Sequence, residues 1–277
     1  MKRVSGGVIF EIKEFGVYDG PGLRLTVFMK GCPLRCTWCH NPEGLSPKPE
    51  VFRDTRRCRL CGLCGWKNGK PNPEICPENL IKAVGRTVTA RELAETIIEY
   101  ADFILPEGGV TFSGGEPLFQ YDFLKETLAL LPKKLHKAME TCAFAPSEQF
   151  AEIAGLLDLV YIDLKHMDER EHKRLTGQSN RLILQNLSLL KRRGCPFIVR
   201  IPLIPGLTDT RENLSAAAEF LSDAAGTVKV ELLSYNQLTG AKYASLGLEY
   251  EPGFDEKRPI NQGASAFGQR GIECTAF

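Results

Sequence analysis

The sequence predicts an α/β fold, a partial (β/α)6 barrel of parallel strands with a small cysteine-rich insert. Two observations predict the barrel: six short apolar runs alternate with segments of helical periodicity, and several of these runs are almost continuously apolar. Such runs suit strands that are buried on both faces of a parallel sheet. A third observation predicts the insert, because seven of the 10 cysteines lie between Cys32 and Cys76.

The composition excludes several other classes of protein. Hydrophobic residues make up 43% of the 277 residues and charged residues 25%, which is ordinary globular usage. The 35 Lys and Arg against 34 Asp and Glu give a net charge of +1, so no global basic field attracts nucleic acid. We find neither a signal peptide nor an apolar run long enough to span a membrane. We therefore expect a cytoplasmic protein without nucleic-acid or membrane partners.

The six apolar runs define the expected strands. They are Leu25–Met29, Gly109–Ser113, Leu135–Thr141, Leu159–Lys165, Phe197–Leu203 and Val228–Tyr235. Between them, five segments are expected to be helical: Thr89–Tyr100, Phe119–Leu131, Pro146–Leu157, Arg181–Arg193 and Thr210–Ala224. Thr89 and Glu92 have the spacing of a capping box at the start of the first helix, and Pro132 ends the second. Strands joined by crossover helices predict the barrel.

One segment, residues 49–87, interrupts this alternation. It contains Cys58, Cys61, Cys64 and Cys76, and it has little helical or strand periodicity. A loop of this length needs something to organise it, and metal ligation is the obvious candidate. We therefore divide the chain into a barrel, residues 1–48 and 88–277, and an insert, residues 49–87.

Three cysteines follow the first expected strand closely. Cys32, Cys36 and Cys39 have the spacing C-x3-C-x2-C. Three thiolates in one short loop can hold three corners of a [4Fe–4S] cluster and leave the fourth iron open to a ligand. A zinc site with His40 as fourth ligand is the alternative. Since active sites of such barrels lie at the C-terminal ends of the strands, the place of the loop favours the cluster.

This loop and four further motifs resemble the glycyl-radical-enzyme activating enzymes of the radical S-adenosylmethionine superfamily. The loop motif is Gly31-Cys-Pro-Leu-Arg-Cys-Thr-Trp-Cys-His-Asn-Pro-Glu43, preceded by Asp19-Gly-Pro-Gly-Leu-Arg24. The others are Gly108–Pro117 with its Gly-Gly-Glu-Pro end, Tyr161–Asp168, Ile201–Gly206 and Glu231–Asn236. Five motifs in the same order cover nearly the whole chain, so the resemblance is specific.

The resemblance implies a reaction. A reduced cluster binds S-adenosylmethionine at its open iron and cleaves it to a 5′-deoxyadenosyl radical, which abstracts a hydrogen from a glycine of a partner glycyl radical enzyme. It also implies an electron donor such as flavodoxin or ferredoxin, and anaerobic chemistry. The cofactor does the hard chemistry, so we expect no catalytic side chain. Two alternatives remain: a radical enzyme acting on a small molecule or peptide, and a non-catalytic carrier with two clusters.

The resemblance also implies which residues bind the cofactor. They are Trp38, Cys39, His40, Gly114, Gly115, Glu116, Asp163, Leu164, Lys165, Arg200 and Asn236. Gly115 matches the position that contacts the methionine amino group, and Lys165 the position that contacts its carboxylate. Glu140 and Thr141 match a pair that, together with Asp163, helps to hold a monovalent cation.

Each of these motifs also has a plainer interpretation. The Gly-Gly-Glu-Pro segment could be an ordinary turn, and Asp163 and Lys165 a charged strand end at the solvent rim. Arg200 could form a structural ion pair, and Asn236 could be a loop residue. The isolated cysteines are expected to be small buried side chains rather than reactive groups. They are Cys142, Cys195 and Cys274.

The four cysteines of the insert resemble half of a ferredoxin motif with a stretched last spacing. Cys58, Cys61, Cys64 and Cys76 are enough for one cluster, so we expect a single auxiliary [4Fe–4S] cluster. A structural zinc ion on the same four thiolates is the alternative. Iron and sulfide analysis distinguishes the two, because zinc would leave only about four irons per chain.

Overall fold

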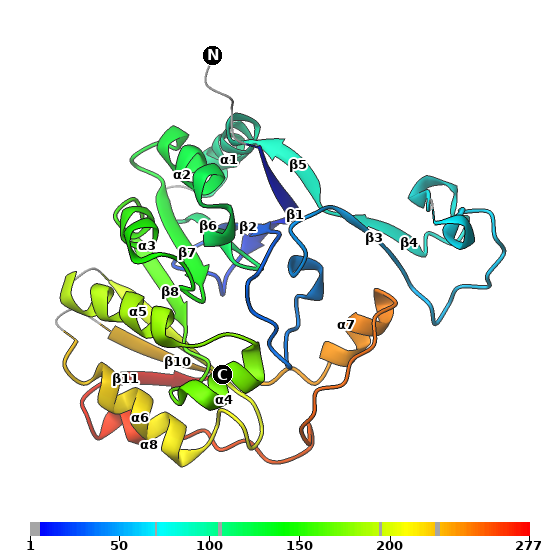
Figure 1. Ribbon diagram of the computed structural model, residues 1–277. Coiled ribbons are helices and arrows are strands. Elements are labelled where there is room, and N and C mark those ends of the chain that lie inside the picture. The colour runs from blue at the N-terminus through cyan, green and yellow to red at the C-terminus, as the bar shows by residue number, and fades with distance from the viewer. Residues whose placement is uncertain (1–5, 70, 105–106, 194–195, 225–227) are drawn as a thin grey trace.

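The computed structural model describes residues 6–69, 71–104, 107–193, 196–224 and 228–277. Its main sheet has nine strands in the order β11-β10-β9-β8-β7-β6-β2-β1-β5, and Figure 1 shows them side by side. The central strands are β2 (Arg24–Met29), β6 (Gly109–Gly114), β7 (His136–Thr141), β8 (Leu159–Asp163), β9 (Phe197–Leu203) and β10 (Val228–Ser234). Neighbours among these six pair in parallel, which confirms the six expected strands.

Three further strands extend this sheet at its edges, and the sequence analysis did not assign them. β1 (Gly6–Gly16) pairs antiparallel with β2, and β5 (Arg86–Thr89) pairs antiparallel with β1. At the other edge β11 (Glu273–Ala276) runs parallel to β10. The described strands therefore form an open, linear order, as a partial barrel requires, with more strands than the six expected.

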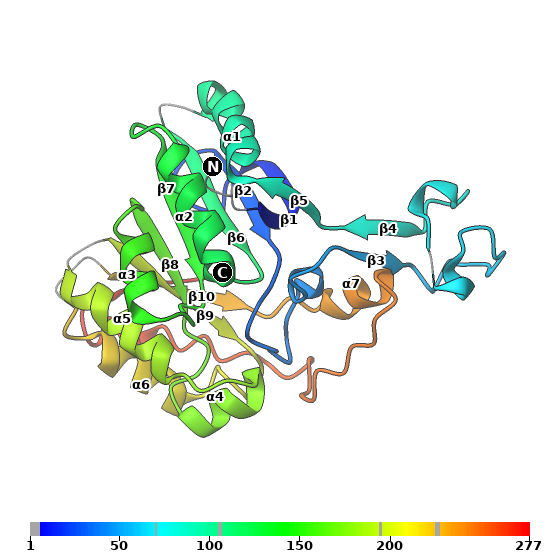
Figure 2. The same cartoon turned by 45° about the horizontal axis from the view of Figure 1, so that its top comes forward.

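Helices α1 (Ala90–Ile104), α2 (Tyr121–Leu130), α3 (Ser147–Ala154), α5 (Arg181–Arg193) and α6 (Arg211–Leu221) cover the outer face of the sheet (Figures 1 and 2). Another helix, α4 (Glu169–Thr176), lies at the end of the barrel where the parallel strands end. The five covering helices confirm the expected ones, and α4 was not expected. The second helix begins later than expected, because residues 117–120 form a 3-10 turn, η4 (Pro117–Gln120). Within the described residues, no helix is both long and apolar enough to cross a membrane.

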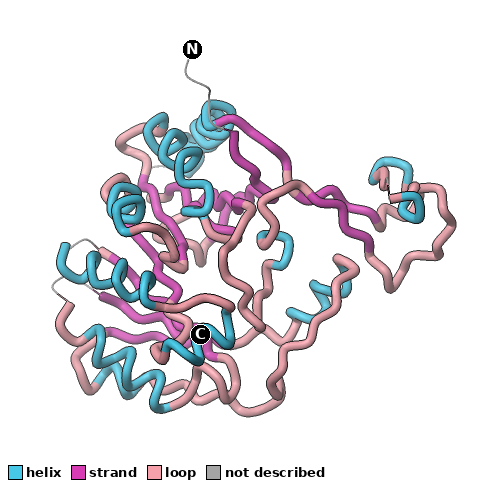
Figure 3. The backbone as a smooth tube through the Cα atoms, in the orientation of Figure 1, coloured by secondary structure: helices cyan, strands magenta, loops and turns pink. Residues whose placement is uncertain are grey.

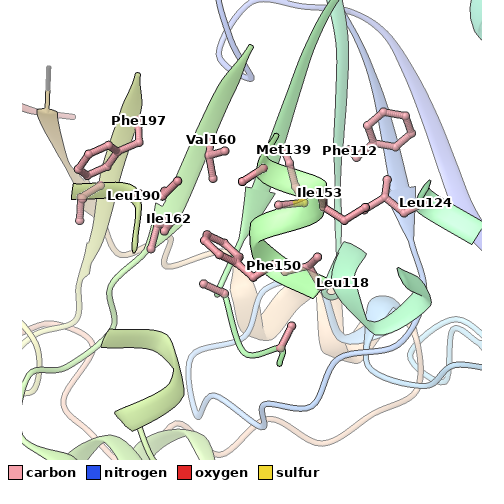
Figure 4. Packing of buried hydrophobic residues seen from close by; sticks show 14 of the residues in the cluster. Phe112, Leu118, Leu124, Met139, Phe150, Ile153, Val160, Ile162, Leu190 and Phe197 are labelled. Atoms are coloured by element: carbon pink, nitrogen blue, oxygen red, sulfur yellow. The ribbon is translucent and has the colours of Figure 1, made fainter. Parts of the chain in front are cut away.

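The hydrophobic core lies between the sheet and these helices. Figure 4 shows Phe112, Met139 and Val160 on the strands facing Phe150 and Ile153 of α3. All five side chains are almost completely buried. The near-continuous apolar runs of the sequence are therefore explained by burial on the helix-covered face together with an inner face that lines the barrel.

The cysteine-rich insert projects from the barrel on a two-stranded stalk (Figures 2 and 3). β3 (Glu50–Arg53) pairs antiparallel with β4 (Ile81–Val84), and the four cysteines lie in the segment between them. The next residues, Arg86 and Thr87, already pair with β1 in the main sheet. The stalk therefore leaves the barrel at Glu50 and returns to it at Gly85.

The C-terminal part of the chain forms α7 (Thr239–Ser245), α8 (Ser265–Gly268) and β11. In both ribbon views α7 lies between the barrel and the stalk of the insert (Figures 1 and 2). Of the three isolated cysteines, Cys142 is buried as expected and Cys274 is half-buried. Cys195 lies outside the described residues.

Candidate functional site

The three-cysteine loop follows β2 and is held by backbone hydrogen bonds at both ends. Gly31 N donates to Gly44 O at 2.8 Å, within the 3-10 turn η1 (Pro42–Gly44) that closes the loop. On the other side, Arg35 N donates to Thr176 O at 2.7 Å and Thr37 N to Leu175 O at 3.1 Å, at the end of α4. The unexpected helix α4 thus fixes the middle of the loop at the C-terminal ends of the strands.

The thiols of this loop are shielded from solvent and therefore stay protonated in the absence of a metal. Burial raises the pKa of Cys32 and of Cys36 to about 12, and burial also raises the pKa of Cys39. Because thiolates are the metal-binding form, iron must displace these protons. Two buried polar atoms of the loop region, Thr37 Oγ1 and Glu43 Oε2, have no hydrogen-bond partner. Buried atoms of this kind usually mark a place where another group binds.

The Gly-Gly-Glu-Pro turn packs directly against the backbone of the loop. Gly114 ends β6 with a φ of +120°, a conformation that favours glycine. A Cβ atom at Gly115 would lie 2.3 Å from Gly44 O and 2.5 Å from Gly31 O. The turn therefore does more than reverse the chain, because its glycines allow the end of β6 to contact the backbone at both ends of the cysteine loop.

Glu116 fixes this turn from inside the protein. Its carboxylate is fully buried and accepts hydrogen bonds from Leu118 N, Thr141 Oγ1 and Cys142 N at 3.0, 2.6 and 2.7 Å. Burial raises the pKa of Glu116, although these hydrogen bonds oppose the shift. The side chain thus joins β6 to the end of β7 and is not free to contact a ligand with either oxygen in this arrangement.

Asp163, Leu164 and Lys165 lie at the end of β8, beside the cysteine loop. Leu164 N donates to Arg200 O at 2.8 Å, and Lys165 Nζ lies 3.1 Å from Asp163 Oδ2. Burial lowers the pKa of Lys165, but the Asp163 carboxylate outweighs it and leaves the pKa raised, and the Lys165 charge in turn lowers the pKa of the Cys36 thiol against the effect of burial. Lys165 is therefore a buried cation next to the thiols, and not a side chain at the solvent rim.

Arg200 lies inside the barrel and is held by two glutamates. It pairs with Glu140 of β7, and its Nε lies 2.9 Å from Glu231 Oε2 of β10. Its Nη2 also donates to Tyr18 O at 2.8 Å, in the loop between β1 and β2, and its guanidinium stacks 4.0 Å from the Tyr161 ring. These contacts support the plainer interpretation of Arg200 as a structural ion pair, which also ties the β1–β2 loop to the barrel.

The groups predicted for a monovalent cation have other partners in the structure. Glu140 is engaged by Arg200 and accepts from Ser113 Oγ at 2.5 Å. The Thr141 hydroxyl donates to Glu116. The cation therefore stays a prediction from the sequence.

The remaining predicted residues differ in their burial. The Trp38 ring is buried against Leu175, Ile204 and Tyr235, whereas His40 is exposed. Asn236 is exposed after β10, and its side chain accepts from Leu238 N at 2.9 Å. That contact is what a plain loop residue would make.

Two lysines near the loop were missed by the sequence analysis. Lys30, at the end of β2, is fully buried, and its Nζ donates to Glu43 O at 2.6 Å and to Glu50 Oε2 at 2.9 Å. Lys242 of α7 pairs with Glu43 Oε1 at 2.7 Å. The position of Lys30, directly before the cysteine loop, could have indicated a role near the site. The sequence around Lys242 gives no such indication.

The four cysteines of the insert surround one cavity of about 200 Å³. Apolar side chains complete its walls, including Leu63, Trp66 and Leu80. Leu80 N donates to Cys76 Sγ at 3.4 Å, and hydrogen bonds to cysteine sulfurs are typical of iron–sulfur sites. Left-handed residues bend the chain around the cavity, among them Leu60 and Gly62, as in the backbone nests that bind anionic clusters.

Among the described residues, no three His, Cys, Asp or Glu side chains are gathered around a point that would hold a single metal ion.

Fold and site together define a class: a partial-barrel enzyme with a thiol-bearing loop at the carboxyl ends of its parallel strands. Comparison with known proteins agrees. The model of the radical SAM superfamily matches residues 26–220. The 4-hydroxyphenylacetate decarboxylase activating enzyme of Clostridioides difficile is 35% identical, over 97% of this chain and 95% of its own. The (2S)-3-sulfopropanediol dehydratase activating enzyme of Klebsiella oxytoca is 33% identical, over 99% and 98%.

A solved structure gives the same result. A domain of the pyruvate-formate lyase-activating enzyme of Bacteroides vulgatus superposes with a TM-score of 0.50 at 28% identity, over 61% of this chain and 99% of that domain. The chain belongs to the glycyl-radical-enzyme activating enzymes of the radical SAM superfamily. It is accordingly a radical S-adenosylmethionine oxidoreductase, and its family implies a [4Fe–4S] cluster and S-adenosylmethionine as cofactors.

Proposed function

We propose that Cys32, Cys36 and Cys39 hold the cluster of this enzyme and that the adjoining strand ends hold S-adenosylmethionine. The main observation in support of this proposal is that two further motifs lie against the same loop. The Gly114–Gly115 turn contacts the backbone of the loop, and Lys165 lies beside its thiols. When bound, the cluster and cofactor supply an electron and a carbon-centred radical. The residues of the chain bind and orient them.

The residues at the strand ends fit the charges of the cofactor. Lys165 is a buried cation and suits the methionine carboxylate, while the backbone around Gly115 suits the amino group because no side chain blocks the approach. Asp163 holds the Lys165 ammonium in place at 3.1 Å. His40, exposed after the third cysteine, and Trp38 follow the family pattern for the adenosyl end. The other residues of the predicted set are Gly114, Glu116, Leu164, Arg200 and Asn236, of which Glu116 and Arg200 already have the protein partners described above.

The partner in this proposal is a glycyl radical enzyme. The names of these relatives point to activation of a decarboxylase, a dehydratase and a lyase, and these partners differ in their own reactions. The shared step is hydrogen abstraction from one glycine Cα, which needs no acid or base from this chain. The second candidate class, an enzyme for a small molecule or peptide, has no comparable support among the close relatives.

We further propose that the insert carries one auxiliary [4Fe–4S] cluster on Cys58, Cys61, Cys64 and Cys76. Support comes from the shared cavity and from the Leu80 N–H donor to Cys76. An electron donor such as flavodoxin or ferredoxin completes the proposed function, because each cleavage consumes one electron.

The decisive experiment replaces Cys36 by alanine and measures iron, sulfide and S-adenosylmethionine cleavage after anaerobic reconstitution. We expect a loss of about four of eight irons and complete loss of cleavage. Cys274→Ala is the matched control, because Cys274 lies in β11, outside both cysteine groups, and should retain both. Cleavage that persists in the Cys36 variant would refute the proposal. Incubation of the reconstituted enzyme with candidate partners, read by electron paramagnetic resonance for a glycyl doublet, identifies the partner.

A further inference from the structure

The segment behind the third cysteine is clamped by α7, from the far end of the chain. Lys242 Nζ lies 2.7 Å from Glu43 Oε1 and 2.8 Å from Asn41 Oδ1. Asn41 and Glu43 follow Cys39 within four residues. One ammonium therefore fixes two side chains of the stretch that leads away from the site.

Glu43 is held by two lysines that come from different parts of the fold. Lys30 binds its backbone oxygen and Lys242 its carboxylate. The residue is buried, and its second carboxylate oxygen has no hydrogen-bond partner. A buried carboxylate depends strongly on a paired cation, and among the residues that the structure describes Lys242 is the one cation paired with the carboxylate itself.

The same helix touches the site and the insert. Burial and the neighbouring Cys39 thiol raise the pKa of Tyr243, the residue after Lys242, and the charges of Glu43 and Lys242 act in opposite directions on the pKa of Cys39. Beyond the helix, Gly247 lies so close to the stalk that a Cβ atom there would be 2.5 Å from Arg53 O. In Figure 2, α7 correspondingly lies between the cysteine loop and the stalk of the insert. A change at Lys242 would therefore alter both the position of the cysteine loop and the charge close to its thiols.

We propose that Lys242 is a positioning residue that neutralises Glu43 behind the cysteine loop, and that the charge balance of this pair sets the reduction potential of the site cluster. The inference rests on the proposed function, since it requires the cluster on Cys32, Cys36 and Cys39. An uncompensated negative charge at low dielectric disfavours addition of an electron nearby, and an uncompensated positive charge favours it. Because the Lys242–Glu43 pair is neutral as a whole, removal of the lysine charge and removal of the glutamate charge should shift the reduction potential in opposite directions.

The test is an anaerobic redox titration of the reconstituted protein, followed by electron paramagnetic resonance of the site cluster. Lys242→Met should lower the potential and Glu43→Gln should raise it, each by about tenfold in the equilibrium constant of reduction. The double variant should return close to the wild-type potential. Lys242→Arg, which keeps the charge, should also retain it. The matched control is Lys125→Met, which breaks an exposed pair with Glu152 and should leave the potential unchanged.

A purely structural ion pair predicts a different pattern, in which both single variants weaken the loop and the double variant does not recover. Equal potentials in all variants, or shifts of the same sign in the two single variants, would overturn the inference. If Lys242→Met does not fold, the upward shift in Glu43→Gln and its cancellation in the double variant still decide the question. Failure of the proposed function gives another result, since the reconstituted wild-type chain would then show no site-cluster signal at all.

Discussion

At the scale of single residues, Gly115 determines how the end of β6 meets the cysteine loop. Gly115→Ala would place a methyl group 2.3 and 2.5 Å from two backbone oxygens, and backbone cannot move aside as a flexible side chain can. We expect the free energy of unfolding to fall by about 1–3 kcal/mol, and the cysteine loop to lose iron on reconstitution. Chemical denaturation and iron analysis measure the two effects.

Gly155→Ala is the matched control for this substitution. Gly155 ends α3 with a φ of −72°, and a Cβ atom there would be no closer than 3.4 Å to any neighbour. This variant should be as stable as the wild type or slightly more stable. Equal stability of the two glycine variants would show that the close approach at Gly115 has no energetic weight.

His136 gives the stability of the barrel a pH dependence. Its Nδ1 lies 3.1 Å from Nη1 of Arg24, an arginine that is fully buried at the start of β2. Burial and the Arg24 charge lower the pKa of His136 below its usual 6.5. As pH falls through 6.5, the unfolded chain therefore binds a proton that the folded chain does not. The free energy of unfolding should then decrease. The stabilisation that depends on an uncharged His136 should be complete only above pH 6.5.

Denaturant titrations between pH 8 and pH 5 measure this effect. In His136→Gln the side-chain oxygen can still accept from Arg24 but cannot be protonated, so the variant should lose less stability than the wild type as the pH falls. The other buried histidines, His166 and His172, contribute equally to both proteins. Parallel pH profiles of the two proteins would contradict the assignment.

At the scale of elements, the sequence predicted best where local pattern and long-range packing agree. All six expected strands and five expected helices are present, and the capping box at α1 is confirmed. Thr89 N donates to Glu92 Oε2 at 2.7 Å and Glu92 N to Thr89 Oγ1 at 3.2 Å. Four-residue edge strands such as β5 and β11 were missed because pairing with a neighbour, rather than their own residues, makes them strands.

The same distinction holds for the site. Cysteine spacing is local, so the loop and the insert group were both readable. The contacts that hold them are not local: Lys242 and Asn41 lie 201 residues apart, and Arg200 and Tyr18 lie 182 apart. The sequence allowed Arg200 to be either a ligand contact or part of an ion pair, because its partners Glu140 and Glu231 come from other strands, β7 and β10. Sequence spacing predicts the metal ligands, and tertiary contacts determine what surrounds these cysteines.

At the scale of the whole molecule, described contacts between the barrel and the insert lie along the stalk, and barrel residues hold the site loop through backbone hydrogen bonds. Lys30 joins the two through Glu50, and Gly247 contacts the stalk at Arg53. The cysteine loop itself is bonded to Gly44, Leu175 and Thr176. The four cysteines of the insert lie beyond the stalk, so their removal should leave the site loop intact.

A single excision tests this division. Asp54 N donates to Leu80 O at 2.9 Å, so the two strands of the stalk are already close enough to be joined there. Replacing residues 55–79 by Asn-Gly should close a two-residue hairpin. The Lys30–Glu50 pair and the approach of Gly247 to Arg53 O should remain, whereas the stacking of Arg53 on Trp66 is lost. Bound iron should fall from about eight to about four per chain, while S-adenosylmethionine cleavage with dithionite as reductant should persist. Cys36→Ala in the full chain loses the same amount of iron but all cleavage. A folded, excised chain that retained four irons but did not cleave the cofactor would contradict this expectation. The proposed cluster loop would then be complete but inactive, and the insert would have to belong to the active site.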